Sequence, residues 1–224
     1  MLVSHIKKFI YTKTVKTAGT SVEVYFEPFC TLPGDSGFSH YREQYVSSAG
    51  IVGYRGPDVR GKQWYNHMPA SLIKSQLGDT LWSEYFKFCV VRNPFERYIS
   101  AFYYLNSIGS IEYSGGGDFK SPIDKFRWWM NQDGIIESIV DRDLYVIEGD
   151  ICVDYVIQYE RLLDGLKVVC DRLGVPYRPQ GLMRLKGGLK PADIHTNDYY
   201  DSKLANRIAD LYSMEIRMFG YSLR

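Results

Sequence analysis

The chain has 224 residues, of which 45% are hydrophobic and 24% are charged, so it can bury a core and lacks the composition of a disordered protein. Its 27 Lys and Arg against 26 Asp and Glu leave a net charge of +1, which excludes recruitment of nucleic acid or an anionic membrane by a global positive field. The length favours one large domain, and we expect a single domain over residues 1–224.

The four cysteines indicate a reducing environment. Cys30, Cys89, Cys152 and Cys170 form no CxxC pair, and two of them stand inside apolar runs, which favours buried thiols over a zinc site or a disulfide framework. The first residues, MLVSHIKKFIYT, mix polar with apolar side chains, and no apolar run of about 18 residues follows. We therefore expect a soluble, cytoplasmic protein without a membrane span.

The first predicted elements are a strand, a turn and a helix. Residues 9–11 are β-prone, residues 13–21 form a glycine-containing turn, and a helix begins there with Thr20 or Ser21 as its N-cap. Residues 27–66 are rich in Gly, Pro, Ser and Tyr, which is typical of an irregular segment that covers a site. A short helix over 69–77, closed by Gly78, follows.

The clearest element is the apolar run over residues 85–91, which is typical of a strand buried on both faces of a parallel sheet. Asn93 as N-cap and Pro94 at the first helical position then predict a helix over 95–105. The glycine-rich residues 107–122 are interpreted as a substrate lid.

The second half predicts three helices and one strand. The helices follow Ser121-Pro122, cover 160–173 before Gly174, and cover 201–219; the strand lies over 154–159. Strands alternating with helices predict the α/β class, with a central parallel sheet flanked by helices and ligands at the carboxyl ends of the strands.

The turn at residues 13–21 could bind a phosphate or sulfate group. It would gather main-chain N–H groups, the positive end of a helix dipole and the hydroxyls of Thr17, Thr20 and Ser21 beside Lys16. It is not a Walker A loop, because Lys16 precedes Gly19 whereas that motif places the lysine after its second glycine. An ordinary capped turn with a surface lysine is the alternative.

A second group of residues follows the strand at 85–91. Arg92 ends that strand, and Ser100 on the next helix can point to the same side, so an arginine fork with a nearby hydroxyl could hold a terminal phosphate. Arg97, one turn into the helix, is better explained by packing or by pairing with an acid such as Glu96.

Together, KTxGTS at Lys16 and RNPxxRxxS at Arg92 resemble the two cofactor signatures of the sulfotransferase family that uses 3′-phosphoadenosine 5′-phosphosulfate (PAPS). The resemblance continues in residues 154–162, DYVIQYERL, and in residues 218–221. It implies a P-loop-NTPase-like sulfotransferase fold. It also implies that the first loop binds the 5′-phosphosulfate and that Arg92 and Ser100 bind the 3′-phosphate. The loop residues that inherit this role are Lys16, Thr17, Ala18, Gly19, Thr20 and Ser21.

The resemblance also suggests further site residues. Relatives close over the nucleotide with a basic, glycine-bearing loop, and Arg184, Lys186 and Gly187 stand at about that point, although a solvated basic loop would look the same. Sulfuryl transfer needs a base for the acceptor hydroxyl. His67, at the head of a short helix, matches the histidine of carbohydrate-modifying members; the alternative is that it only caps that helix.

We expect an enzyme that transfers a sulfuryl group from PAPS to a hydroxyl or amine of a small-molecule or carbohydrate acceptor, releases 3′-phosphoadenosine 5′-phosphate (PAP), and needs no metal. Lys16 and His67 are the expected catalytic residues. A P-loop-like ATP-dependent kinase and a non-catalytic nucleotide-binding protein remain the alternatives. We expect no nucleic acid as partner and no membrane span, and the sequence does not indicate the oligomeric state.

Overall fold

The structure is a computed structural model that describes residues 1–35, 37, 39, 41–113, 119–183 and 189–224. The chain divides into two compact units, Met1–Val91 with Asp141–Leu185 and Arg92–Val140 with Lys186–Arg224. Each unit is described by itself below. The single domain expected over residues 1–224 stays a prediction.

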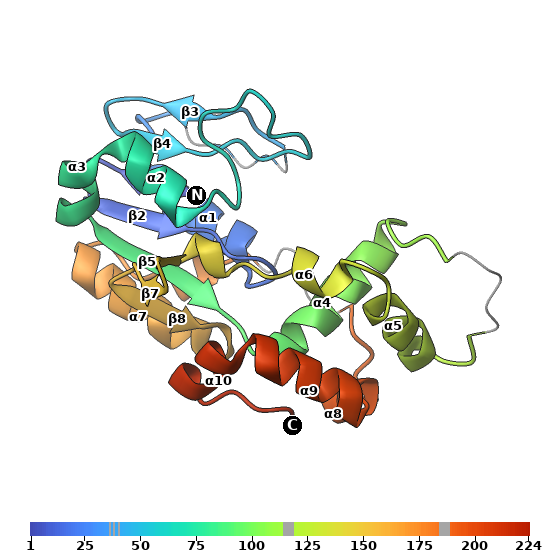
Figure 1. The fold of residues 1–224 in the computed structure, drawn as a ribbon. Helices are drawn as coiled ribbons and strands as arrows, with labels where there is room; N and C mark the ends of the chain where they lie inside the picture. The colour runs from blue at the N-terminus through green and yellow to red at the C-terminus, as the bar shows by residue number, and fades with distance from the viewer. Residues whose placement is uncertain (36, 38, 40, 114–118, 184–188) are drawn as a thin grey trace. The chain divides into compact units, whose positions relative to one another are not determined.

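The first unit is built around a mixed β-sheet (Figure 1). Among the described residues, six strands pair in the order β3-β4-β1-β2-β5-β8. The pairs β2-β5 and β5-β8 are parallel, and β1-β2, β1-β4 and β3-β4 are antiparallel. The strands are β1 (Leu2–Ser4), β2 (Phe9–Thr12), β3 (Tyr45–Val46), β4 (Gly50–Val52), β5 (Phe86–Val91) and β8 (Tyr155–Gln158), beside a small hairpin of β6 (Val146–Ile147) and β7 (Asp150–Ile151).

Helices cover both faces of this sheet. They are α1 (Gly19–Phe26), α2 (Ala70–Leu77), α3 (Asp79–Glu84) and α7 (Leu162–Leu173), with short 3-10 turns at Glu27–Phe29, Arg142–Leu144, Tyr159–Arg161 and Pro179–Gly181. Successive side chains of β2 point to opposite faces of the sheet, so the strand contributes to a hydrophobic core on each face. Phe9 and Tyr11 pack with side chains of α1 and α7, and Ile10 packs with side chains of α2 and α3.

The α/β class, with a central sheet flanked by helices, is confirmed. The parallel strands β2, β5 and β8 correspond to the predicted strands. In β2 and β5 most residues are buried, as expected of apolar runs in strands covered on both faces. The antiparallel extension was not predicted, since β1, β3 and β4 have only two or three residues each. The expectation that residues 27–66 are irregular is therefore wrong at β3 and β4.

The second unit is helical. Its helices are α4 (Pro94–Ser107), α5 (Pro122–Met130), α6 (Ile135–Ser138), α8 (Thr196–Tyr199), α9 (Ser202–Leu211) and α10 (Ser213–Phe219). Aromatic rings form its core: the ring centroids of Phe102 and Phe126 are 5.5 Å apart, and those of Phe126 and Tyr199 are 5.2 Å apart.

The single helix expected over 201–219 is wrong, because the chain leaves helical geometry at Tyr212 and forms α9 and α10. Tyr212 is buried, and its hydroxyl lies 3.4 Å from that of Tyr98. Packing of this ring outweighs the helical periodicity of the sequence. Of the predicted lid, residues 114–118 lie outside the described residues.

Among the residues that the structure describes, no helix combines the length and the apolar character needed to cross a membrane. Cys30, Cys89 and Cys170 are buried, as expected, and Cys152 is partly exposed.

Candidate functional site

The turn between β2 and α1 leads into a helix whose start has no side-chain cap. Lys16 and Ala18 both have φ of 59°, in the left-handed region, and α1 begins at Gly19. The N-cap is Ala18, which has no side-chain acceptor, so the expected capping by Thr20 or Ser21 is wrong. The N–H groups of Gly19 and the next two residues therefore point out of the helix without a cap, at the positive end of its dipole.

The hydroxyls of this turn differ in their surroundings. Thr17 is buried, and its Oγ1 lies 2.7 Å from Oγ1 of Thr14, whose hydroxyl donates to the main-chain oxygen of Val90. Ser21 is also buried, whereas Thr20 is half-buried. The Thr14–Thr17 pair fastens the turn to the end of β5.

An acidic side chain also fastens the turn. The main-chain N–H of Val15 donates to Oδ2 of the buried Asp141, at 2.7 Å. The two residues are separated by 126 positions in the chain, and nothing in the sequence around Asp141 indicated this contact.

His67 lies beside the same turn. Its Nδ1 is 3.0 Å from the main-chain oxygen of Lys13, and its backbone has a φ of 52°. It does not cap α2, because the N-cap of that helix is Pro69 and the cap makes no side-chain hydrogen bond. The alternative of a helix-capping histidine is therefore wrong in its geometry.

The ionisation of His67 reflects its neighbours. The residue is exposed to solvent, but nearby protein atoms still remove part of the hydration of its ring. This desolvation, together with the positive charges of Lys13 and the Met1 amine, lowers the pKa of His67 well below its usual 6.5. The imidazole is therefore neutral near pH 7.

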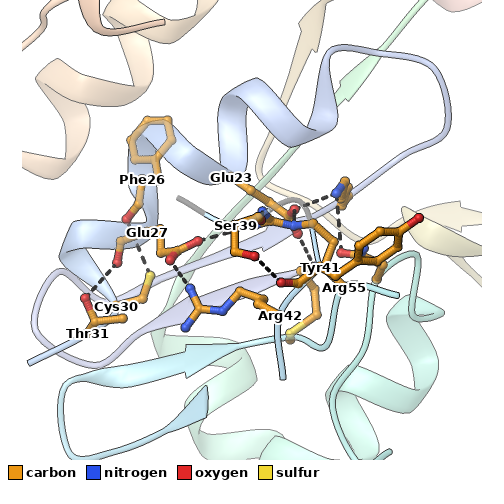
Figure 2. Close-up of polar contacts among 12 residues, drawn as sticks. Glu23, Phe26, Glu27, Cys30, Thr31, Ser39, Tyr41, Arg42 and Arg55 are labelled. Carbon is orange, nitrogen blue, oxygen red and sulfur yellow. Dashed lines mark hydrogen bonds and ion pairs between the residues drawn. The ribbon is translucent and has the colours of Figure 1, made fainter. Parts of the chain in front are cut away.

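Behind the turn lies a buried network of charges (Figure 2). In the described chain, Glu23 of α1 contacts Lys13 Nζ, the Met1 amine at 2.9 Å and Arg55 Nε at 3.2 Å. Arg55 also pairs with Glu27 at 3.3 Å, and Arg42 pairs with Glu27. Burial alone would raise the pKa of Glu23, but the three positive groups outweigh it and hold that pKa below its usual range.

In the second unit, α4 begins as the sequence predicts. The side chain of Asn93 accepts a hydrogen bond from Phe95 N at 3.1 Å, and Pro94 occupies the first helical position. Arg92 pairs with Glu96 at 3.7 Å, and Ser100 is half-buried.

Two other basic residues of this unit, Lys190 and Arg97, also make contacts within it. Glu96 also contacts Lys190 Nζ at 3.6 Å. Arg97 is buried, and its guanidinium lies 5.5 Å from the ring centre of Tyr212, which agrees with the packing interpretation. The predicted Arg184, Lys186 and Gly187 lie outside the described residues.

The sequence interpretation missed Lys13 and Glu23. A signal for Glu23 was present, because it is an acid between Val22 and Val24 in an otherwise apolar helical segment, where a charge must be paired if it is buried. Within the described chain, no group of three or more His, Cys, Asp or Glu side chains is arranged to hold a metal ion.

Comparison with known proteins identifies the family. The family model described as "Sulfotransferase family" matches residues 1–124. This range is more than half of the chain and contains the β2-α1 turn, His67, Arg92 and Ser100. No curated protein and no solved structure matches the chain. The chain belongs to the sulfotransferase family.

Proposed function

We propose that this sulfotransferase transfers a sulfuryl group from PAPS to a hydroxyl or amine of a small-molecule or carbohydrate acceptor. The family generally uses PAPS as its donor. The observation that carries the proposal is that a neutral histidine, His67, contacts the same turn of the first unit that leads into an uncapped helix start. Such a turn offers N–H donors to a sulfate group and a base beside it.

In this proposal the β2-α1 turn binds the 5′-phosphosulfate. The main-chain N–H groups of Ala18, Gly19, Thr20 and Ser21 and the Thr20 hydroxyl donate to its oxygens. Thr17 contributes through its main chain, because its hydroxyl is committed to Thr14. The Lys16 ammonium neutralises the charge that develops on the bridging oxygen.

His67 is the proposed base for the acceptor. The acceptor oxygen attacks sulfur, the bond between sulfur and the bridging oxygen breaks, and PAP leaves with that electron pair. The acceptor proton passes to His67 Nε2, which carries a lone pair because Nδ1 carries the proton. An amine acceptor would lose its proton to the same nitrogen.

Arg92 and Ser100 are the proposed ligands of the 3′-phosphate. The Arg92 guanidinium supplies a planar pair of donors, and the Ser100 hydroxyl adds another. Arg184, Lys186 and Gly187 are proposed to bind the nucleotide as well, as the resemblance implies. The whole chain then acts as one catalytic domain.

Two alternative functions can be distinguished from sulfuryl transfer. An ATP-dependent kinase of P-loop type would need a lysine after the second glycine of its loop, which this turn lacks. A nucleotide-binding protein without catalysis would bind PAP but turn over neither donor.

The direct test uses one panel of hydroxyl- and amine-bearing acceptors with radiolabelled PAPS and, separately, with ATP labelled in its terminal phosphate. We expect label to move from PAPS only, with one PAP released per sulfated product. Transfer from ATP would support the kinase, and binding of PAP without transfer from either donor would support the non-catalytic alternative.

A further inference from the structure

The segment Lys13-Thr-Val-Lys16 contains two lysines, and the proposed chemistry uses only Lys16. Lys13 is nearly fully buried, with 4% of its surface exposed. Its ammonium donates to Oδ1 of Asn66 at 3.3 Å, and its main-chain oxygen accepts from Nδ1 of His67 at 3.0 Å. Lys13 therefore holds the dipeptide Asn66-His67 by both its side chain and its main chain.

The path of the Lys13 side chain is itself fixed. Its ammonium forms a buried ion pair with Glu23, which Arg55 holds in turn. To reach Glu23 the side chain crosses Gly19: a Cβ at position 19 would stand 2.8 Å from Lys13 Cγ and 3.0 Å from Lys13 Cε. Gly19 has no unusual φ that would require glycine, so the glycine of the motif leaves room for Lys13.

This arrangement decides which nitrogen of His67 carries the proton. A carbonyl oxygen can only accept, so Nδ1 of His67 must be the donor in the contact with Lys13. In a neutral imidazole the other nitrogen, Nε2, then carries a lone pair. The groups that face His67 are Lys13 and the Met1 amine, which oppose protonation of the ring, and Glu23, which favours it.

We propose that Lys13 is a positioning residue for His67: held by Glu23, it fixes the Asn66-His67 segment and keeps the His67 proton on Nδ1, so that Nε2 is the nitrogen that accepts the proton of the acceptor. This inference rests on the proposed function for the role of Nε2. The placement of the proton does not depend on that function and can be measured without an acceptor.

The test is a nuclear magnetic resonance measurement of the imidazole nitrogens, whose shifts distinguish the two tautomers, on the full chain near pH 7. His67→Asn identifies the signals of His67. The wild type should show Nδ1 protonated and Nε2 unprotonated. Lys13→Met removes the ammonium and leaves Glu23 with the Met1 amine and Arg55, and it should move a measurable part of the population to the Nε2–H tautomer.

Two further variants keep the test decisive. Lys62→Met removes a lysine that pairs with Glu43 at 2.6 Å in the same unit, and it should leave the His67 signals unchanged. Asn66→Ala removes only the 3.3 Å contact to Lys13 and should shift the tautomer in the same direction but less. It serves as the test variant if Lys13→Met does not fold.

Nucleotide binding and turnover complete the test. Lys13→Met should retain PAP affinity, because the Lys13 ammonium is engaged with Glu23 and Asn66. Turnover should fall about tenfold or more, up to the 10²–10⁴-fold that a general base contributes. The inference is overturned if wild-type His67 carries its proton on Nε2. It is also overturned if Lys13→Met, or Asn66→Ala in its place, leaves the tautomer unchanged, or if Lys13→Met loses PAP affinity with an unchanged tautomer. Correct tautomer shifts in a protein that uses no PAPS would refute the proposed function alone.

Discussion

Replacing Glu23 by Gln should destabilise the first unit strongly. The carboxylate is fully buried, and in the described chain it faces Lys13, the Met1 amine and Arg55. Glu23→Gln keeps the shape of the side chain but leaves these buried positive groups without their shared negative charge. Removal of one partner from a buried ion pair costs about 3–5 kcal/mol, and we expect the free energy of unfolding to fall by that amount at pH 7.

The loss should depend on pH in a defined direction. The pKa of Glu23 is lowered in the folded protein, so its contribution to stability is present above the pKa of the unfolded chain, about 4.3, and disappears as the pH falls through the folded value. The difference in unfolding free energy between wild type and Glu23→Gln should therefore shrink in acid.

Urea unfolding followed by tryptophan fluorescence measures both effects. A matched control is Asp58→Asn, which breaks an exposed ion pair with Arg60 at 2.7 Å and should leave the unfolding midpoint unchanged. The ion pairs at the two sites have similar contact distances, but Glu23 is buried and Asp58 is exposed. A Glu23→Gln midpoint equal to that of the wild type would refute the reasoning, as would a difference that grows in acid.

Three predictions concern the proposed site. Arg92→Ala should weaken PAP binding by about 1.5–3 kcal/mol, the range for hydrogen bonds to charged groups, and hardly change 5′-AMP binding; equal losses for both nucleotides in calorimetry would make Arg92 structural. Lys16→Ala should reduce turnover more than PAPS affinity, because the charge on the bridging oxygen is greatest in the transition state; an effect on KM alone would contradict this role. His67→Asn can still donate an amide hydrogen to Lys13 but lacks Nε2, so it should keep thermal stability and lose turnover by about a hundredfold or more. His67→Gln, which lacks the Nδ1 donor, should lose stability as well, and full activity in His67→Asn would leave the base unassigned.

The elements predicted correctly were those with strong local signals. The buried strand at β5 and the helix α4 follow from an apolar run and from the Asn93-Pro94 start, and both depend only on neighbouring residues. The helix ends at Gly78 and Gly174 were also predicted from the sequence, because glycine ends helices in backbone conformations that other residues avoid.

What could not be predicted depends on distant contacts. Strands of two or three residues, such as β3, carry too little pattern to be recognised, and they form because β1 and β4 offer partners. The break at Tyr212 results from packing of its ring. Local rules were also wrong at the start of α1: they placed a hydroxyl cap at Thr20 or Ser21, whereas the N-cap is Ala18, two or three residues earlier.

In the candidate site, too, residues with a local sequence signal were found and residues that depend on distant contacts were missed. Lys16, Gly19 and His67 were singled out from motifs, and the sulfotransferase family is confirmed. Lys13, Glu23 and Asp141 were missed because their roles come from partners far along the chain: His67 for the main chain of Lys13, Arg55 for Glu23 and Val15 for Asp141.

Titration calorimetry with PAP, ADP and ATP most directly tests the claim on which the proposed sulfuryl transfer depends, that the chain recognises a nucleotide with a 3′-phosphate, because it needs no acceptor. The charge-assisted bonds to the 3′-phosphate should make PAP bind about tenfold or more tighter than ADP, which lacks that group, and tighter than ATP. ATP or ADP binding at least as tightly as PAP would contradict the account.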